Sequence, residues 1–165
     1  MSEASFIENR TYDEIAIGES ASLQRHVRHE DVVLFAALSG DINPAHMDPD
    51  YARGTPFGEV IAHGMFAGAL VSNVLGMQLP GPGTIYLSQN LRFRRPVKLG
   101  DTLTVTVTCA EKQEKKRVKF DCVVSNQDGE AVVKGEAEVI APGEKVRRPR
   151  PVVPEVSLDG VPVAL

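Results

Sequence analysis

One short stretch of the chain combines the side chains that acid–base chemistry needs. Residues 39–46 read Ser-Gly-Asp-Ile-Asn-Pro-Ala-His, so the Asp41 carboxylate and the His46 imidazole lie five residues apart with a proline between them. An acid–base pair acts only when both groups are held near one reacting atom, which a stiff loop can do. Taken alone, this spacing favours a structural alternative, in which Asp41 caps nearby backbone N–H groups and His46 is a surface loop histidine.

Asp41 and His46 also carry donor atoms that metal ions use. Together with His63 they would supply two imidazoles and one carboxylate, the ligand set of some iron sites. Their spacing matches no recognised metal motif, so we expect no metal here and interpret His63 as a structural histidine. The chain also lacks the glycine loops that bind dinucleotides or phosphates and the Gly-x-Ser-x-Gly turn of serine hydrolases.

A second candidate lies where Ile61-Ala62-His63-Gly64 leads into a long apolar stretch. The first N–H groups of a helix have no partner within the helix and carry a partial positive charge. A thioester carbonyl placed there would have its developing enolate charge stabilised, and Gly64 would let it approach the backbone closely. The alternative is that Gly64 only begins a buried helix.

The elements that must position these groups can be predicted from hydrophobic periodicity. Residues 30–38 have acids in the first turn and then apolar residues at helical spacing, and Gly40 follows where such a helix would end. Residues 65–77 are apolar almost all round, which is typical of a buried helix. Between them, residues 41–56 are polar and predict only one short helical turn, near Tyr51.

The second half of the chain predicts an antiparallel sheet. Residues 102–109 and 118–124 alternate apolar and polar side chains, which indicates a sheet packed on one face. The apolar helix is the natural cover for that face. The predicted fold class is therefore α+β, with an antiparallel sheet wrapped around a central buried helix. The predicted strands are 21–27, 85–93, 102–109, 118–124 and 131–140.

Both cysteines fall on these strands. A hairpin turn at Gln113 and Glu114 would place Cys109 opposite Val118 and four strand positions from Cys122, roughly 13 Å at the usual strand rise. A disulfide needs Cα atoms within about 7 Å. We therefore expect both cysteines to be reduced residues of the core.

Length and composition limit the class of protein. The chain has 165 residues, 42% of them hydrophobic and 24% charged, which suits one domain with its own core. A net charge of −4 argues against nucleic-acid binding, and the most apolar stretch is too short and too polar to span a membrane. The first residues carry acids without an apolar leader, so we expect a cytoplasmic protein. Five of the 11 prolines lie after residue 140, which predicts a domain at 8–140 and a proline-rich basic tail or linker at 141–165.

Three blocks of the sequence occur in a fixed order. They read SGDINPAHMDPDYA, IAHGMFAGALVSNVLG and LPGPGTIYLSQNLRFRRPVKLGD. Over about residues 12–140, this order resembles the MaoC-like hydratases, which are (R)-specific enoyl-CoA hydratases with a hot-dog fold. With its basic, proline-rich tail, the chain most resembles the N-terminal hydratase domain of bifunctional enoyl-CoA hydratase/phosphate acetyltransferases. No acetyltransferase domain is expected in these 165 residues, so the chain is expected to be either a standalone relative or a piece once fused to such a domain.

The resemblance implies a role for five residues. Asp41 and His46 match the catalytic pair that holds and activates a water molecule. Gly64 matches the backbone donor to the thioester oxygen. Asn43 matches the asparagine of the motif and shapes the substrate-binding loop, and Ser72 matches a position that lines the active site.

The resemblance also implies an activity, the hydration of trans-2-enoyl-CoA to (R)-3-hydroxyacyl-CoA, a reversible lyase reaction of fatty-acid metabolism. It implies no cofactor, because coenzyme A is part of the acyl-CoA substrate, and at least a homodimer with the active site at the subunit boundary. Nucleic acids and membranes are not expected partners. Two alternatives stay open: an acyl-CoA thioesterase of the same fold, and a non-catalytic acyl-CoA-binding domain.

Two clusters of basic residues are candidates for the phosphate groups of coenzyme A. Both are more typical of a solvated surface or a basic linker than of a binding site. They are Arg92, Arg94, Arg95 and Lys98 near a strand end, and Arg147, Arg148 and Arg150 in the tail.

Overall fold

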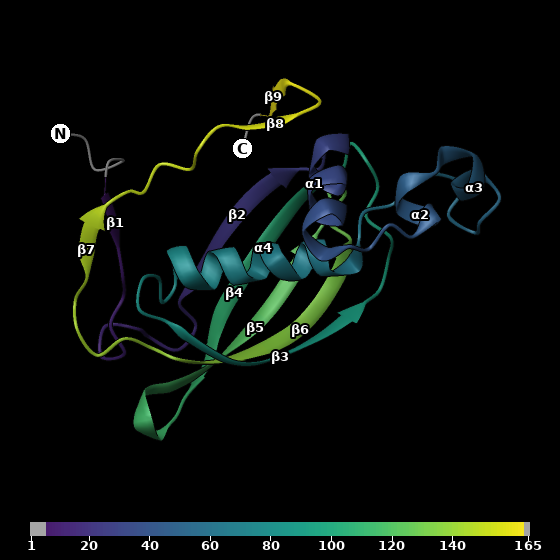
Figure 1. The fold of residues 1–165 in the computed structure, drawn as a ribbon. Coiled ribbons are helices and arrows are strands. Elements are labelled where there is room, and N and C mark those ends of the chain that lie inside the picture. Colours follow the sequence, from purple (N-terminus) through teal and green to yellow (C-terminus); the bar gives the residue numbers. More distant parts are fainter. Residues whose placement is uncertain (1–5, 164–165) are drawn as a thin grey trace.

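The computed structural model describes residues 6–163, in which a five-stranded antiparallel sheet curls around one helix (Figure 1). The strand order is β2-β4-β5-β6-β3, so β3 forms one edge of the sheet and β2 the other. The α+β class and the wrapped helix are both confirmed. The strands of this sheet are β2 (Ser20–His26), β3 (Ile85–Phe93), β4 (Thr102–Lys112), β5 (Arg117–Ser125) and β6 (Ala131–Ile140). The helices are α1 (His29–Ser39), α2 (Pro44–Met47), α3 (Pro49–Arg53) and α4 (Gly64–Met77).

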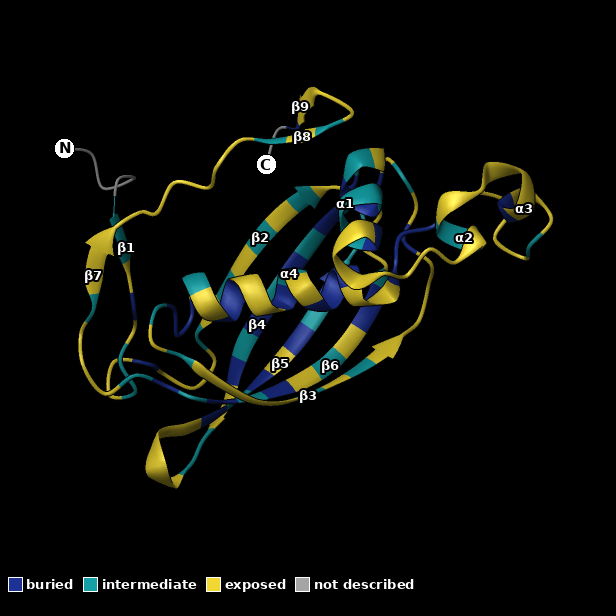
Figure 2. Ribbon diagram, in the orientation of Figure 1, coloured by how far each residue is buried: buried dark blue, intermediate teal, exposed yellow. Residues whose placement is uncertain are grey.

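Helix α4 lies against the concave face of the sheet and forms the core with it. One side of α4 faces β4 and β5 and is buried, whereas its other side is exposed, as Figure 2 shows. The strands contribute alternate residues, so that every second side chain of β4 and β5 is removed from water. The residues of this core that are no more than 2% exposed include Val71, Leu75, Val105, Val107 and Phe120.

Strand β3 differs from the centre of the sheet. Within the described residues it pairs only with β6, and most of its side chains are exposed. Ile85, Leu87 and Phe93 are 56%, 42% and 52% exposed. An open edge with large apolar side chains is a surface that proteins usually cover.

The two cysteines are free and buried, as expected, but the predicted register is wrong. The chain turns through a short 3₁₀ segment, Glu114–Lys116, and Cys109 lies opposite Phe120, two positions from Cys122 rather than four. The turn is longer than a tight hairpin, with Lys115 and Lys116 both left-handed at φ of 58° and 60°, and a bulge between Cys109 and Glu111 shifts the register further. Burial raises the pKa of the Cys122 thiol to about 11, which keeps it protonated at neutral pH.

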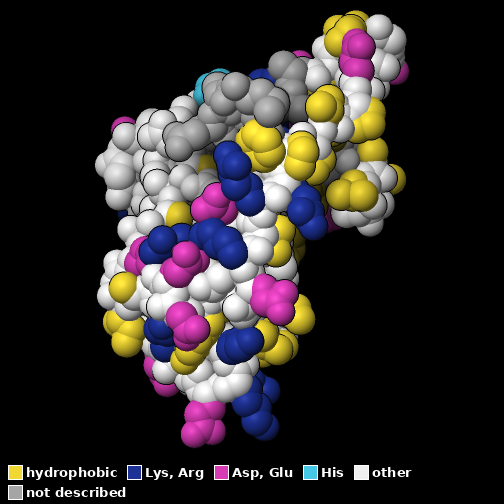
Figure 3. Space-filling view, turned by 90° about the vertical axis from the view of Figure 1, so that its left-hand side faces the viewer, with side chains coloured by type: hydrophobic (Ala, Val, Ile, Leu, Met, Phe, Trp, Pro, Cys, Tyr) yellow, Lys and Arg dark blue, Asp and Glu magenta, His cyan; other side chains and the backbone are white. Residues whose placement is uncertain are grey.

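The tail folds back in two short pairings. Strand β7 (Arg147–Pro149) pairs with β1 (Phe6–Glu8), and β8 (Val156–Leu158) forms a hairpin with β9 (Val161–Val163). Lys and Arg side chains interleave with Asp and Glu on the face that carries β1 and β7 (Figure 3), and Arg147 lies 3.6 Å from Glu8.

Within residues 6–163, no helix is long and apolar enough to cross a membrane.

Candidate active site

The segment that carries Asp41 and His46 begins where α1 ends. Gly40 adopts a left-handed conformation with φ of 75°, and its N–H donates to the carbonyl of Ala36 at 2.8 Å. A glycine is favoured at this position because other residues are strained there. The chain therefore turns sharply out of α1, and Asp41 is the first residue after the turn. We call residues 40–63 the site segment, which joins α1 to α4.

The other end of α1 is anchored to the sheet by Asp31. This side chain is buried, and it accepts hydrogen bonds from the backbone N–H of Arg28 and from the guanidinium groups of Arg25 and Arg28. Burial raises the pKa of Asp31, but these hydrogen bonds outweigh it and hold the pKa below its usual value. The ionised carboxylate thus ties α1 to β2, where Arg25 lies.

Within the site segment there are two helical turns, not the single turn predicted near Tyr51. The Asn43 side chain accepts from the N–H of Ala45 at 3.0 Å and begins α2, and the Asp48 side chain accepts from the N–H of Asp50 at 2.9 Å and begins α3. Each helix also has a proline at its start. Asn43 therefore shapes the loop, as the resemblance implied, through a helix cap.

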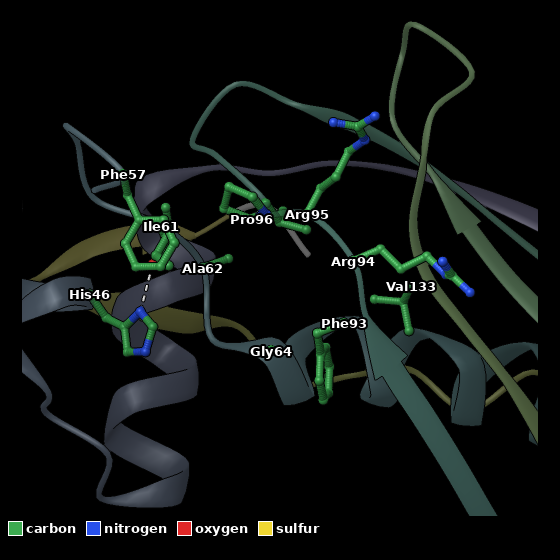
Figure 4. Close-up of a pocket in the computed structure, with 11 residues that line it drawn as sticks. His46, Phe57, Ile61, Ala62, Gly64, Phe93, Arg94, Arg95, Pro96 and Val133 are labelled. Atoms are coloured by element: carbon green, nitrogen blue, oxygen red, sulfur yellow. Dashed lines mark hydrogen bonds between the residues drawn. The ribbon is translucent and has the colours of Figure 1, made fainter. Parts of the chain in front are cut away.

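His46, on α2, is held by one of its ring nitrogens. Its Nδ1 lies 2.7 Å from the carbonyl oxygen of Ile61, as the dashed line in Figure 4 shows. A carbonyl can only accept, so the ring proton is on Nδ1 and the Nε2 of a neutral imidazole is free to accept. The side chain is half-buried and lines a cavity next to the start of α4.

His63 lies directly against this pair and is only 3% exposed. Its Nε2 donates to the backbone carbonyl of Asp41 at 2.8 Å, and its ring centroid is 4.0 Å from that of His46. On α1, the Phe35 ring packs 4.9 Å from it. Nδ1 of His63 has no hydrogen-bond partner among the described residues. Spacing in the sequence could not reveal this role, because the contact spans 22 residues.

Asp41, His46 and His63 each offer a ligand atom, and these atoms lie within 4.8 Å of one another. The structure therefore brings together the three residues of the metal alternative. Two of the four imidazole nitrogens already bind main-chain carbonyls, so only His46 Nε2 and His63 Nδ1 remain for other partners. Asp41 is exposed, and its carboxylate accepts from the N–H of Asn43 at 3.2 Å.

Gly64 is the first residue of α4, and its N–H makes no hydrogen bond within the described part of the chain. A cavity of about 320 Å³ opens at this point, with His46 and Gly64 on its wall (Figure 4). A Cβ atom at Gly64 would come within 3.0 Å of the Phe93 ring, which also lines the cavity. The glycine therefore lets the Phe93 ring approach the start of α4 closely at the cavity wall.

Ser72 lies elsewhere on α4. It is exposed and lines a separate groove of about 350 Å³ with Met65, Tyr86 and Leu91. Phe35 lines the same groove and also packs on His63, so the groove begins next to the histidine cluster. Ser72 does not line the cavity that contains His46 and Gly64.

The basic residues after β3 are not equivalent. Lys98 pairs with Glu59, and Arg95 pairs with Glu130 at 3.1 Å. Arg94 lines the cavity of His46 and Gly64, and its guanidinium forms no ion pair with the described residues. The tail arginines do not line this cavity.

Comparison with known proteins identifies the family. Residues 14–132 match the MaoC like domain. The chain belongs to the MaoC-like family. One relative is named (R)-specific enoyl-CoA hydratase and comes from Rhodospirillum rubrum. It is 48% identical to this chain over 134 residues, and the alignment covers 79% of this chain and 91% of the relative.

A second relative in sequence and one solved structure are also similar to this chain. One, named 3-hydroxybutyryl-CoA dehydratase, from Methylorubrum extorquens, is 42% identical over 139 residues, covering 84% of this chain and 88% of the relative. The solved structure of the R-hydratase PhaJ1 from Pseudomonas aeruginosa superposes with a TM-score of 0.90 at 49% identity, covering 93% of this chain and 99% of that one. The expected hot-dog fold is thereby confirmed.

Proposed function

We propose that this protein is an (R)-specific enoyl-CoA hydratase, which adds water to trans-2-enoyl-CoA and forms (R)-3-hydroxyacyl-CoA. One observation carries the proposal: His46 and the unpaired N–H of Gly64 line one cavity, with Asp41 adjoining His46, in a chain 48% identical to a relative of that name. The pair supplies groups that move a proton, and the helix start supplies a donor for a negative oxygen.

The chemistry needs one water molecule between Asp41 and His46. Asp41 accepts a proton from this water as its oxygen bonds to Cβ of the substrate. The electron pair of the double bond then moves toward the thioester oxygen, where the Gly64 N–H stabilises the negative charge. The proton is finally delivered to Cα, so that one water is consumed and both residues return to their initial state.

His46 orients the water in this scheme. Its Nδ1–H is bound to the carbonyl of Ile61, which leaves Nε2 to accept a hydrogen bond from the water. Asp41, with His46 beside it, then returns the proton that it took from the water to Cα of the substrate. Because each step is reversible, dehydration of the hydroxyacyl thioester follows the same path, and the relative from M. extorquens is named for that direction.

Every step uses side chains and backbone groups of this chain. No cofactor is required beyond the coenzyme A of the substrate. We also propose that the phosphates of coenzyme A contact Arg94, because it lies on the cavity wall and its charge is not neutralised by a carboxylate of the described residues. The cytoplasmic location stays a prediction, and the choice between a standalone protein and a piece once fused to a phosphate acetyltransferase domain stays open.

We further propose that the protein acts as a homodimer joined along β3. This strand lies at an open edge of the sheet and exposes Ile85, Leu87 and Phe93. Pairing with a second β3 would satisfy its free backbone groups and cover these side chains. Phe93 also lines the cavity, so such an interface would reach the site.

The test is the reaction of the purified protein with crotonyl-CoA. We expect the absorbance of the enoyl thioester to disappear, with (R)-3-hydroxybutyryl-CoA as the product in chiral analysis. Release of free thiol would show a thioesterase instead. Binding of crotonyl-CoA without turnover would show a binding domain, and either result would overturn the proposal.

A further inference from the structure

We propose that His63 is a positioning residue of this active site, which holds Asp41 through a hydrogen bond and the His46 ring through stacking. The inference rests on the proposed function. His63 itself does not face the cavity of His46 and Gly64, so it acts through its neighbours rather than on the substrate.

The hydrogen bond is the long-range restraint on Asp41. Among the described residues, the other hydrogen bonds of Asp41 are local: its N–H donates to Ser39 Oγ at 3.2 Å, and its carboxylate accepts from the N–H of Asn43 at 3.2 Å. Within residues 6–163, the hydrogen bond from His63 Nε2 to the Asp41 carbonyl at 2.8 Å is the one that ties this exposed residue to the buried part of the molecule. Misplacing a catalytic group by about 1 Å can cost about 100-fold in rate.

The ring of His63 also restrains His46, because the two imidazoles stack on each other. The two imidazole centroids are 4.0 Å apart with planes inclined by 33°, and Phe35 of α1 supports His63 from another side at 4.9 Å. His46 is also held by the carbonyl of Ile61, two residues before His63. The three residues 61–63 thus hold both members of the catalytic pair.

This short clamp is itself tied to the connection between β3 and β4. The N–H of Ala62 donates to the carbonyl of Val97 at 2.8 Å, and Ile61 forms an isolated bridge with Lys98. His63 continues directly into α4, whose opposite side is packed in the core. The residues that hold the proposed catalytic pair are therefore connected to the buried part of the molecule, through Val97 on one side and through α4 on the other.

A purely structural role does not explain a histidine here. Its Nδ1 is buried without a partner among the described residues, which is unfavourable for folding, and an apolar ring would avoid that cost. An apolar ring at this position could not make the hydrogen bond that His63 Nε2 donates to the Asp41 carbonyl. The hydrogen bond to Asp41 is therefore the contact that distinguishes a histidine from an apolar ring at this position.

Two variants separate the contacts. His63→Phe keeps a ring to stack on His46 and removes the donor to Asp41. His63→Gln keeps an N–H donor near the position of Nε2 and removes the stack. With crotonyl-CoA, we expect kcat of His63→Phe to fall at least tenfold with KM within about twofold of the wild type and no loss of thermal stability. His63→Gln should recover a large part of kcat.

A second readout does not depend on turnover. The imidazole ¹⁵N spectrum of the wild type should show His46 as the Nδ1–H tautomer that the Ile61 carbonyl fixes. In His63→Gln this signal should shift and broaden, because the ring loses its stacking partner and becomes more mobile. Wild-type kcat in His63→Phe, or activity losses that follow thermal stability in both variants, would overturn the inference. If the wild type hydrates no enoyl-CoA, the proposed function fails, whereas an unchanged His46 signal in His63→Gln would overturn the stacking role.

Discussion

The centre of the sheet and the site segment are built in opposite ways. In the centre, Leu75 of α4 and Val105 of β4 are 0% exposed. In the site segment, Ile42, Tyr51 and Phe57 are 72%, 53% and 41% exposed, and the helices have only four and five residues. Apolar burial therefore stabilises the first region, whereas local caps and a few long-range hydrogen bonds hold the second.

The difference between the two regions shows how the positions of the site side chains are fixed in a small domain. The site segment has too little burial to be rigid by packing, yet acid–base catalysis requires fixed geometry. The two regions meet at residues 61–64, where the clamp and the first N–H of α4 lie side by side in sequence. In the proposed mechanism the reacting side chains lie on the site segment, and contacts with Ile61 and His63 hold them in position.

The strongest test of this contrast compares two apolar truncations. Leu75→Ala should lower the free energy of unfolding by about 2–5 kcal/mol, because it leaves a cavity in a fully buried position. Ile42→Ala, at a position 72% exposed, should change it by less than about 0.5 kcal/mol. Denaturant unfolding measures both values, and similar losses in the two variants would contradict the contrast.

The anchor of α1 on the sheet gives a pH-dependent test. The pKa of Asp31 is lower in the folded protein than in the unfolded chain, where it is about 4. The ionised carboxylate therefore stabilises the fold fully above about pH 4. This stabilisation is lost as the pH falls through the pKa of the folded state. Asp31→Asn should therefore cost about 2 kcal/mol at pH 7 and progressively less below pH 4. Asp50→Asn, at an exposed ion pair with Arg53, is the control and should have little effect. A cost for Asp31→Asn that is independent of pH would refute this assignment.

A third test asks whether the site extends beyond the site segment to the end of β3. Arg94→Gln should raise KM for crotonyl-CoA about tenfold, a loss typical of one charge-assisted contact. It should leave KM for crotonyl-pantetheine, which lacks the nucleotide phosphates, unchanged. Lys98→Gln is the matched control, because Lys98 is already paired with Glu59. Equal effects of Arg94→Gln on both substrates would exclude a phosphate contact.

The smallest expected effect concerns metal ions. Asp41, His46 and His63 lie close enough to bind one, but the proposed mechanism uses them as an acid–base pair with a supporting histidine. Dialysis against a chelator should leave kcat for crotonyl-CoA within about twofold of its initial value. Loss of activity that added metal restores would favour the metal alternative instead.

Much of the fold could be predicted because its signal is local and repeated. The alternation along β4 and β5 and the apolar character of α4 follow directly from burial on one face or on most of a helix. One helical turn was predicted where the structure has two, α2 and α3. Each helix is too short to show hydrophobic periodicity, and each begins at a single capping side chain, Asn43 or Asp48. The β4–β5 register depended on a left-handed turn residue, Lys115, that alternation cannot reveal.

The candidate site was predictable only in part. Spacing alone favoured a structural role for Asp41 and His46, and the resemblance of three blocks to a family pointed to catalysis. No pattern in the sequence indicated that His63 contacts both of them, because the contact forms only when α1, α2 and the start of α4 come together. Long-range contacts of this kind require the structure.

The most direct test of the account is the turnover of crotonyl-CoA by Asp41→Asn and His46→Ala. Both variants replace residues on the exposed site segment, so the fold should be retained and kcat should fall by at least about 100-fold. Asp48→Asn, which keeps the cap of α3, is the control and should retain wild-type turnover. Near wild-type turnover in either Asp41→Asn or His46→Ala would contradict the assignment of this pair.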